Sequence, residues 1–188
     1  MSWKPSSVAN PPNKMRTLIL IPTETEAALL RAACPDAPVR IAGVGMAAAA
    51  AATARIIAEE HPDRLILAGI AGASDRSGAV CEVVAVAGER IAELPGKYAV
   101  RYAADFIPAG LRTVESNTTN RTGVAASGTQ IENMEGAAFL AVCRAFGVPG
   151  AEVRAVSNYT DDPRSAWRIE ESAEKLAKTI IRILPDYE

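Results

Sequence analysis

Short apolar runs alternate along the chain with longer stretches of helical character. The run Arg16–Pro22 (RTLILIP) is almost continuously apolar, which is typical of a strand buried on both faces of a sheet. The stretch Met46–His61 is rich in alanine, the residue with the highest helix propensity, and Pro62 ends it. The pattern therefore predicts a buried strand followed later by a strong helix.

The alternation continues to the end of the chain, where residues 165–184 form an amphipathic pattern with apolar side chains near one helix face. Strand–helix alternation predicts a single α/β domain over 15–188, with a mostly parallel central sheet flanked by helices on both faces. Residues 1–14 are polar and predict a disordered tail. Further strands are expected at 38–45, 63–74, 79–91, 97–106, 122–127 and 151–158, and further helices at 23–33 and 130–143.

Composition excludes several classes of function. The formal net charge is −2, only 5% of residues are aromatic, and no basic block occurs, so no nucleic-acid partner is expected. Apolar runs are too short or interrupted to span a bilayer, and no secretory signal is seen, which predicts a cytoplasmic protein. Cys34, Cys81 and Cys143 are far apart in the sequence, which predicts that they are reduced thiols. The single histidine, His61, falls in a helix-to-strand turn, so neither a zinc site nor a Ser-His-Asp triad is expected.

In parallel sheets, ligands bind beyond the carboxyl ends of the strands. No GxGxxG opens a helix and no GxxxxGK[ST] is present, so neither a dinucleotide site nor a P-loop is predicted. The segments at the expected strand ends are instead small and glycine-bearing, or carry carboxylates and amides. They read PTETEA, GVGMA, GIAGAS, SGTQIENMEG and SNYTDD.

Glu135 is out of place among the small, apolar residues of the helix expected at 130–143. One interpretation is that the carboxylate faces an open cleft, where the hydroxyl groups of a ligand donate hydrogen bonds to it. The alternative is that it lies on the surface in the first turn of the helix, where the helix macrodipole stabilises a negative charge. Glu132 fits the second role better, since Thr129–Glu132 matches a capping box. The pattern therefore favours Glu135 as a ligand-binding residue and Glu132 as a cap.

Five segments follow one another between about Leu18 and Asp162: ILIPTETEA, AGVGMAAAAAATARII, PDRLILAGIAGA, ENMEGAAFLAVCRAFGVP and VRAVSNYTDD. In this order they resemble the purine nucleoside phosphorylase and nucleosidase superfamily. Within it, ENMEGAAF together with SN is most similar to futalosine hydrolase, and the methylthioadenosine/adenosylhomocysteine nucleosidases are the nearest alternative.

The resemblance implies a nucleosidase that uses water to cleave futalosine to hypoxanthine plus dehypoxanthine futalosine. Glu26 would position and deprotonate the water, and its alternative role is a capping box with Thr23. Asn158 stands where many nucleosidases carry an aspartate that protonates the base. Its amide suits a 6-oxopurine, and Asp161 or Asp162 is the alternative acid.

The resemblance also implies a substrate-binding set made of Ala71, Gly72, Asn133, Met134 and Glu135, with the last two against the ribose. It implies a small-molecule nucleoside as partner and a homo-oligomer, a dimer or larger. No metal or organic cofactor is implied.

Two departures from the superfamily pattern keep alternatives open. The segment between SGT and IENMEG is shorter than in relatives, which leaves a non-catalytic nucleoside-binding protein as one alternative. The first strand-end loop, PTETEA, lacks the arginine that phosphorolytic relatives place there, which disfavours a phosphorylase. Arg31 is expected on the solvent face of its helix.

Overall fold

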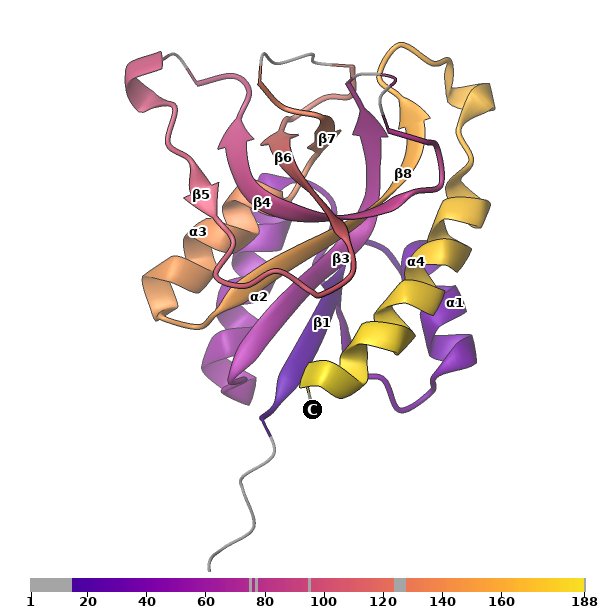
Figure 1. Ribbon diagram of the computed structural model, residues 1–188. Coiled ribbons are helices and arrows are strands. Elements are labelled where there is room, and N and C mark those ends of the chain that lie inside the picture. The colour runs from indigo at the N-terminus through magenta and orange to yellow at the C-terminus, as the bar shows by residue number, and fades with distance from the viewer. Residues whose placement is uncertain (1–14, 75, 77, 95, 124–127, 188) are drawn as a thin grey trace, which may run out of the picture.

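The computed structural model describes residues 15–187 except 75, 77, 95 and 124–127 (Figure 1). The expected tail at 1–14 and four residues of the strand expected at 122–127 lie outside the described residues. The elements are β1 (Thr17–Ile21), α1 (Glu24–Ala33), β2 (Val39–Ile41), α2 (Met46–Glu60), β3 (Arg64–Ala73), β4 (Val83–Ile91), η1 (Gly96–Tyr98), β5 (Tyr102–Ala103), β6 (Arg112–Thr118), β7 (Ile131–Asn133), α3 (Gly136–Phe146), β8 (Gly150–Tyr159), η2 (Arg164–Ala166), α4 (Ile169–Ile183) and η3 (Leu184–Tyr187).

The prediction of an α/β fold is confirmed, but the sheet is mixed rather than mostly parallel. β1 pairs in parallel with β2 and β3, and β3 pairs in parallel with β8. β7 runs antiparallel to β3, and β4 runs antiparallel to β5 and β8. Because β6 joins β4 to β7, the strands β3, β7, β6, β4 and β8 close on themselves as a barrel.

The barrel exists because long strands change neighbours along their length. β3 pairs with β1 through Arg64–Leu67 and with β7 only through Gly72 and Ala73. Its first half therefore lies in an open parallel sheet and its last residues lie in the barrel wall. The strand β6 was not predicted, because its sequence RTVESNT is largely polar and lacks the apolar run of a buried strand.

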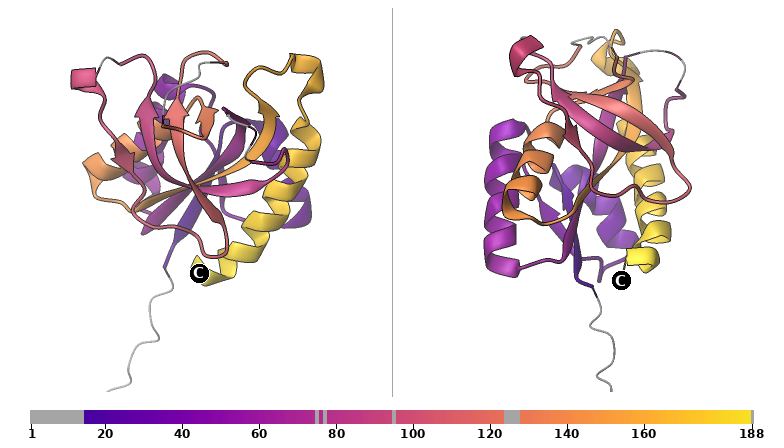
Figure 2. Two further views of the ribbon diagram at one scale, coloured as in Figure 1. Left: turned by 45° about the horizontal axis from the view of Figure 1, so that its top comes forward. Right: turned by 60° about the vertical axis from the view of Figure 1, so that its left-hand side comes forward.

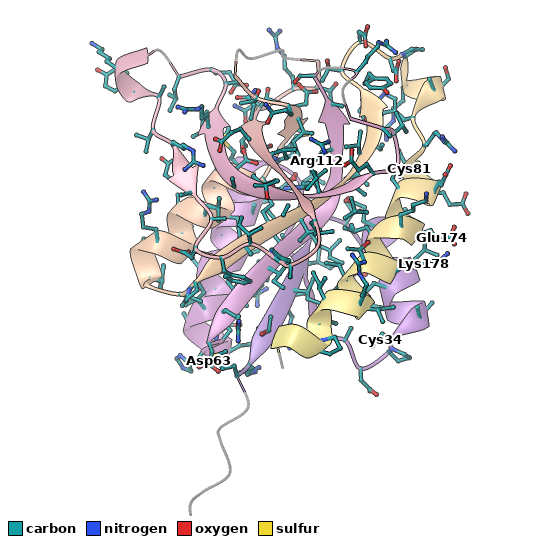
Figure 3. All side chains as sticks on the ribbon, viewed as in Figure 1. Cys34, Asp63, Cys81, Arg112, Glu174 and Lys178 are labelled. Carbon is teal, nitrogen blue, oxygen red and sulfur yellow. The ribbon has the colours of Figure 1, made fainter. Side chains whose placement is uncertain are left out.

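Helices cover both faces of the sheet, as predicted (Figure 2). Leu30 of α1 and Ile180 of α4 pack in the core cluster on one face, whereas Ile56 of α2 and Phe139 of α3 pack in the cluster on the other. Glu174 and Lys178 form an exposed ion pair on the outer side of α4 (Figure 3). None of the described helices is long and apolar enough to cross a membrane.

His61 has the structural role that the sequence predicts. It is the C-cap of α2 in a left-handed conformation (φ 48°), and its N–H donates to the carbonyl of Ile57 at 3.1 Å. Its side chain is exposed at the turn into β3. Cys34, Cys81 and Cys143 are free thiols, and burial raises the pKa of the Cys143 thiol.

Candidate active site

A cavity of about 230 Å³ opens beyond the carboxyl ends of β1, β3 and β8. This is the end of the sheet where the sequence predicts the ligand; Asp63, which precedes β3, lies at the opposite end in Figure 3. All the predicted site residues line the cavity. The lining residues include Pro22, Thr23, Glu26, Val44, Ile70, Ala71, Gly72, Thr119, Thr122, Glu132, Asn133, Met134, Glu135, Arg154, Ser157, Asn158, Arg164 and Trp167.

Arg154 is the structural centre of this site, and its side chain is fully buried. Its Nε donates to Glu152 Oε1 at 2.7 Å, and its Nη2 donates to Asn133 Oδ1 at 2.9 Å. Its Nη1 donates to Glu135 Oε2 at 3.3 Å. Space for the guanidinium comes from Gly69, because a Cβ there would lie 2.5 Å from Arg154 Nη1. The sequence reasoning did not identify Arg154 as a site residue.

Glu135 is buried at the cavity, where the sequence predicts a ligand-binding carboxylate. Its Oε1 accepts the backbone N–H of Gly45 at 3.0 Å, and its Oε2 accepts the bond from Arg154. It precedes the first residue of α3, but its side chain caps no N–H of that helix. The cap comes from Asn133, whose Oδ1 accepts the N–H groups of Glu135 and Gly136 at 2.9 and 2.7 Å.

The predicted capping box of Thr129 and Glu132 is wrong. Glu132 lies in β7, and α3 begins four residues later, because Asn133 rather than Thr129 accepts the first free N–H groups. The Glu132 side chain is 5% exposed, lines the cavity, and accepts the N–H of Gly123 at 2.6 Å. Glu132 therefore lines the site, whereas its sequence pattern predicted a helix cap.

Glu26 lies in the first turn of α1 beside its cap, Thr23, and also lines the cavity. Its N–H donates to Thr23 Oγ1 at 3.2 Å, so Thr23 caps α1 as predicted. Its carboxylate faces the cavity and accepts the Thr23 hydroxyl at 2.9 Å and the N–H of Ile70 at 3.0 Å. Burial raises the pKa of the Glu26 carboxyl, and the bonds from Ile70 and Thr23 and the charge of Arg154 oppose this.

Asn158 and Glu132 lie on opposite sides of Gly72 in the sheet. Gly72 pairs with Glu132 of β7 on one side and with Asn158 of β8 on the other, where the β3–β8 register shifts between Ala71 and Gly72. A Cβ at Gly72 would lie 3.2 Å from Asn158 Nδ2 and 3.4 Å from Glu132 Cγ. The missing side chain therefore leaves a slot between an amide and a carboxylate.

The alternative acids Asp161 and Asp162 do not line the cavity. Asp162 accepts the N–H of Tyr159 at 2.8 Å, and Asp161 forms an exposed ion pair with Arg76 at 3.2 Å. These are local contacts of the turn after β8. Arg31 is also where it was predicted, in a partly exposed ion pair with Glu24.

The sequence reasoning also missed Arg164 and Trp167, which line the cavity from η2 and the residue after it. The guanidinium of Arg164 lies 4.2 Å from the centroid of the Trp167 ring. A tryptophan in a polar, proline-containing segment soon after a strand end was the available signal, because such a side chain needs an apolar partner.

Comparison of the sequence with known proteins supports the resemblance. The family model described as Phosphorylase superfamily matches residues 111–187. The resemblance predicted from the sequence is therefore confirmed. Futalosine hydrolase of Thermus thermophilus is 45% identical over 60 residues, which are 31% of this chain and 27% of that protein. The aligned segment thus spans about a quarter of that relative.

Solved structures show the same fold over nearly the whole chain. A futalosine hydrolase mutant of Helicobacter pylori strain 26695 superposes with a TM-score of 0.82 and 14% identity, covering 92% of this chain and 99% of that one. The 5'-methylthioadenosine/S-adenosylhomocysteine nucleosidase of Neisseria meningitidis, in complex with methylthio-immucillin-A, gives 0.79 and 21%, covering 92% and 100%.

Replacement of Gly136 by alanine should destabilise the protein. Its Cβ would lie 2.5 Å from Glu152 Oε2 and 2.5 Å from Glu89 Oε1, both on fully buried side chains. Such overpacking costs about 1–3 kcal/mol of the free energy of unfolding, measured by chemical denaturation. Gly96→Ala is the matched control, since nothing lies within 4 Å of its added Cβ. Equal stability of the two variants would show that the buried carboxylates can move apart.

Proposed function

We propose that the protein is a nucleosidase that uses water to cleave the N-glycosidic bond of a purine nucleoside, with futalosine as substrate and hypoxanthine as the leaving base. The observation that carries the proposal is the pair of buried carboxylates, Glu26 and Glu135, that face one cavity at the sheet end. The identity to a futalosine hydrolase over 60 residues supports the choice of substrate.

Glu26 is the general base of the proposed reaction. Its carboxylate takes a proton from water while the water oxygen attacks C1′ of an oxocarbenium-like sugar, and the bond to the purine breaks. A general base works best when its pKa lies near the working pH, and burial moves the pKa of Glu26 in that direction. The bonds from Thr23 and Ile70 hold the carboxylate in place.

Glu135 binds the ribose hydroxyls in this proposal. One of its oxygens accepts a hydrogen bond from Gly45 and the other accepts one from Arg154, whereas an ionised carboxylate has about four acceptor positions. Two sugar hydroxyls can therefore donate to it. Met134 lines the cavity beside it and offers an apolar surface to the sugar ring.

The slot over Gly72 binds the leaving base. A 6-oxopurine presents an N1–H donor beside an O6 acceptor, and the carboxylate of Glu132 with the amide of Asn158 matches this pair. Asn158 can donate its NH₂ to the charge that develops toward O6, which stabilises the transition state more than the ground state. Adenine presents an acceptor at N1, which the Glu132 carboxylate would repel.

We also propose that the protein is a cytoplasmic homo-oligomer. The support is the resemblance and the position of Val44, which lines the cavity although 55% of it is exposed. A neighbouring copy that covers Val44 would complete the cavity wall.

One panel of nucleosides separates this function from its alternatives. The protein is incubated with futalosine, inosine and methylthioadenosine, with and without phosphate, and the products are identified. Free base with free sugar supports the hydrolase, whereas a sugar 1-phosphate supports the phosphorylase. Binding without release of base would support a non-catalytic nucleoside-binding protein.

Glu26→Gln should abolish hydrolysis and leave nucleoside binding largely intact, because the amide keeps the shape but cannot accept the proton. A positioned base contributes about 10²- to 10⁴-fold to the rate, so kcat should fall in that range. The kcat of wild type should also fall as pH decreases through the pKa of Glu26, which burial raises above its ordinary value, because the protonated carboxyl cannot accept a proton from water. Near-native turnover of the variant would contradict the role of Glu26 as general base and leave only its structural role beside Thr23 at the start of α1.

Glu135→Ala should weaken binding of the intact nucleoside at least tenfold while hardly changing the affinity for free hypoxanthine. Losing a hydrogen bond to a charged group costs about 1.5–3 kcal/mol. Calorimetry with futalosine and with hypoxanthine measures both affinities. Equal losses for the two ligands would contradict a role at the ribose.

Asn158→Asp should shift activity from futalosine toward methylthioadenosine, because a carboxyl can protonate the adenine leaving group and an amide cannot. The ratio of kcat/KM for the two substrates measures the shift. Asp161→Asn is the control and should leave the ratio unchanged, since Asp161 pairs with Arg76 outside the cavity. If wild type prefers methylthioadenosine, the methylthioadenosine nucleosidase alternative replaces the futalosine assignment.

A further inference from the structure

A second pair of carboxylates lies beneath the cavity, and the proposed reaction does not use it. Glu89 of β4 and Glu152 of β8 are both 0% exposed. They meet in the space left by Gly136, where an added Cβ would lie 2.5 Å from an oxygen of each. Glu89 Oε1 and Glu152 Oε2 therefore face the same small space, each 2.5 Å from the position of that Cβ.

The partners of the two carboxyl groups identify the oxygens that face each other. Glu89 Oε1 accepts Asn133 Nδ2 at 2.6 Å, and Glu89 Oε2 accepts the Thr118 hydroxyl at 2.8 Å. Glu152 Oε1 accepts Arg154 Nε at 2.7 Å. Glu152 Oε2 has no bond from any donor group among the described residues. The contact between the carboxyl groups therefore joins Glu152 Oε2 to Glu89.

Ionised carboxylates accept hydrogen bonds but cannot donate them, so Glu152 Oε2 can form a hydrogen bond with the facing Glu89 Oε1 only when one of the two carboxyl groups carries a proton. We propose that Glu89 and Glu152 share one proton, and that the singly charged pair positions Arg154 toward Glu135 at the ribose end of the cavity. The shared proton stands on the geometry alone, whereas the positioning role rests on the proposed nucleosidase function.

Charge balance supports a single proton on the pair. The charged groups around the pair are Arg154 on β8 and Glu135 before α3, while β6 and β7 contribute neutral groups. Glu26 on α1 interacts with Arg154 and Glu135 rather than with the pair. With one proton, the pair carries one negative charge, equal and opposite to that of Arg154; without it, the pair would add a second negative charge to a cluster that already holds Glu135 and Glu26. Burial raises the pKa values of both carboxyl groups, the charge of Glu152 adds to the rise for Glu89, the charge of Glu135 adds to it for Glu152, and Arg154 opposes the rise for both.

The proton on the pair then determines how strongly the positive charge of Arg154 acts on the carboxylates of Glu135 and Glu26 at the cavity. A guanidinium that is already balanced leaves Glu135 free to accept sugar hydroxyls, and it lowers the pKa of Glu26 only modestly. Removing all negative charge from the pair would leave Arg154 to act fully on both carboxylates. An unbalanced opposite charge nearby lowers the pKa of a carboxyl by about 1–3 units.

Three variants test the proposal: Glu89→Gln, Glu152→Gln and the double variant. Each single change removes the shared proton and keeps one negative charge, so the pH at which kcat falls in acid should stay as in wild type. The double variant removes the charge, so the acid limb should move down by about 1 pH unit or more and KM for futalosine should rise. Glu82→Gln is the control, because Glu82 pairs with Arg112 at the surface.

Infrared spectroscopy at neutral pH follows the proton without any activity. Wild type and Glu82→Gln should show a buried protonated-carboxyl band that is missing from both single variants. A single variant that shifts the acid limb, or a wild type without this band, would overturn the proposal. If the double variant does not fold, the single variants and the band still decide it. If wild type cleaves no nucleoside, the proposed function fails while the band still tests the proton.

Discussion

The buried guanidinium of Arg154 is the constraint on which the site depends. A charge removed from water is tolerated only where partners satisfy nearly all of its donors. Glu152, Asn133 and Glu135 supply those partners from β8, β7 and the start of α3. Gly69 stays without a side chain because the guanidinium occupies that space. β7, the start of α3 and β8, together with the more distant β3 that carries Gly69, are thereby fixed around one point at the base of the cavity.

A buried ion cluster is weak support for stability, because well-packed apolar side chains in its place are often as good or better. The cluster here lies directly under a cavity, and its outer members, Glu26 and Glu135, face that cavity. Their carboxylates are held by backbone N–H groups of Ile70 and Gly45, which need no reorganisation when a ligand enters. The arrangement provides fixed hydrogen-bond acceptors for the hydroxyl groups of a ligand and for water. The negative charge of the two carboxylates disfavours the binding of an anionic nucleophile such as phosphate.

Features that the local sequence pattern encodes could be predicted, whereas features that depend on contacts between distant residues could not. Strand–helix alternation and the cap at Thr23 are local signals, and the structure has both. The closure of the sheet depends on β6 and β7, which are polar or short and gain their stability from neighbours. The pattern Thr129–Glu132 matches a capping box locally, yet Asn133 accepts the helix N–H groups because Arg154 and Glu89 hold its side chain in place.

Two strands carry the side chains at the end of the cavity where the leaving base is proposed to bind. Because β7 pairs directly with β3, Glu132 is fixed by the backbone register opposite Gly72. Asn158 is fixed in the same way by β8 on the other side of that glycine. Side chains carried by two sheet strands need no loop to order them, so less conformational entropy would be lost on binding of the proposed base. The short sequence between SGT and IENMEG is therefore compatible with the proposed selectivity, because that selectivity comes from the strands.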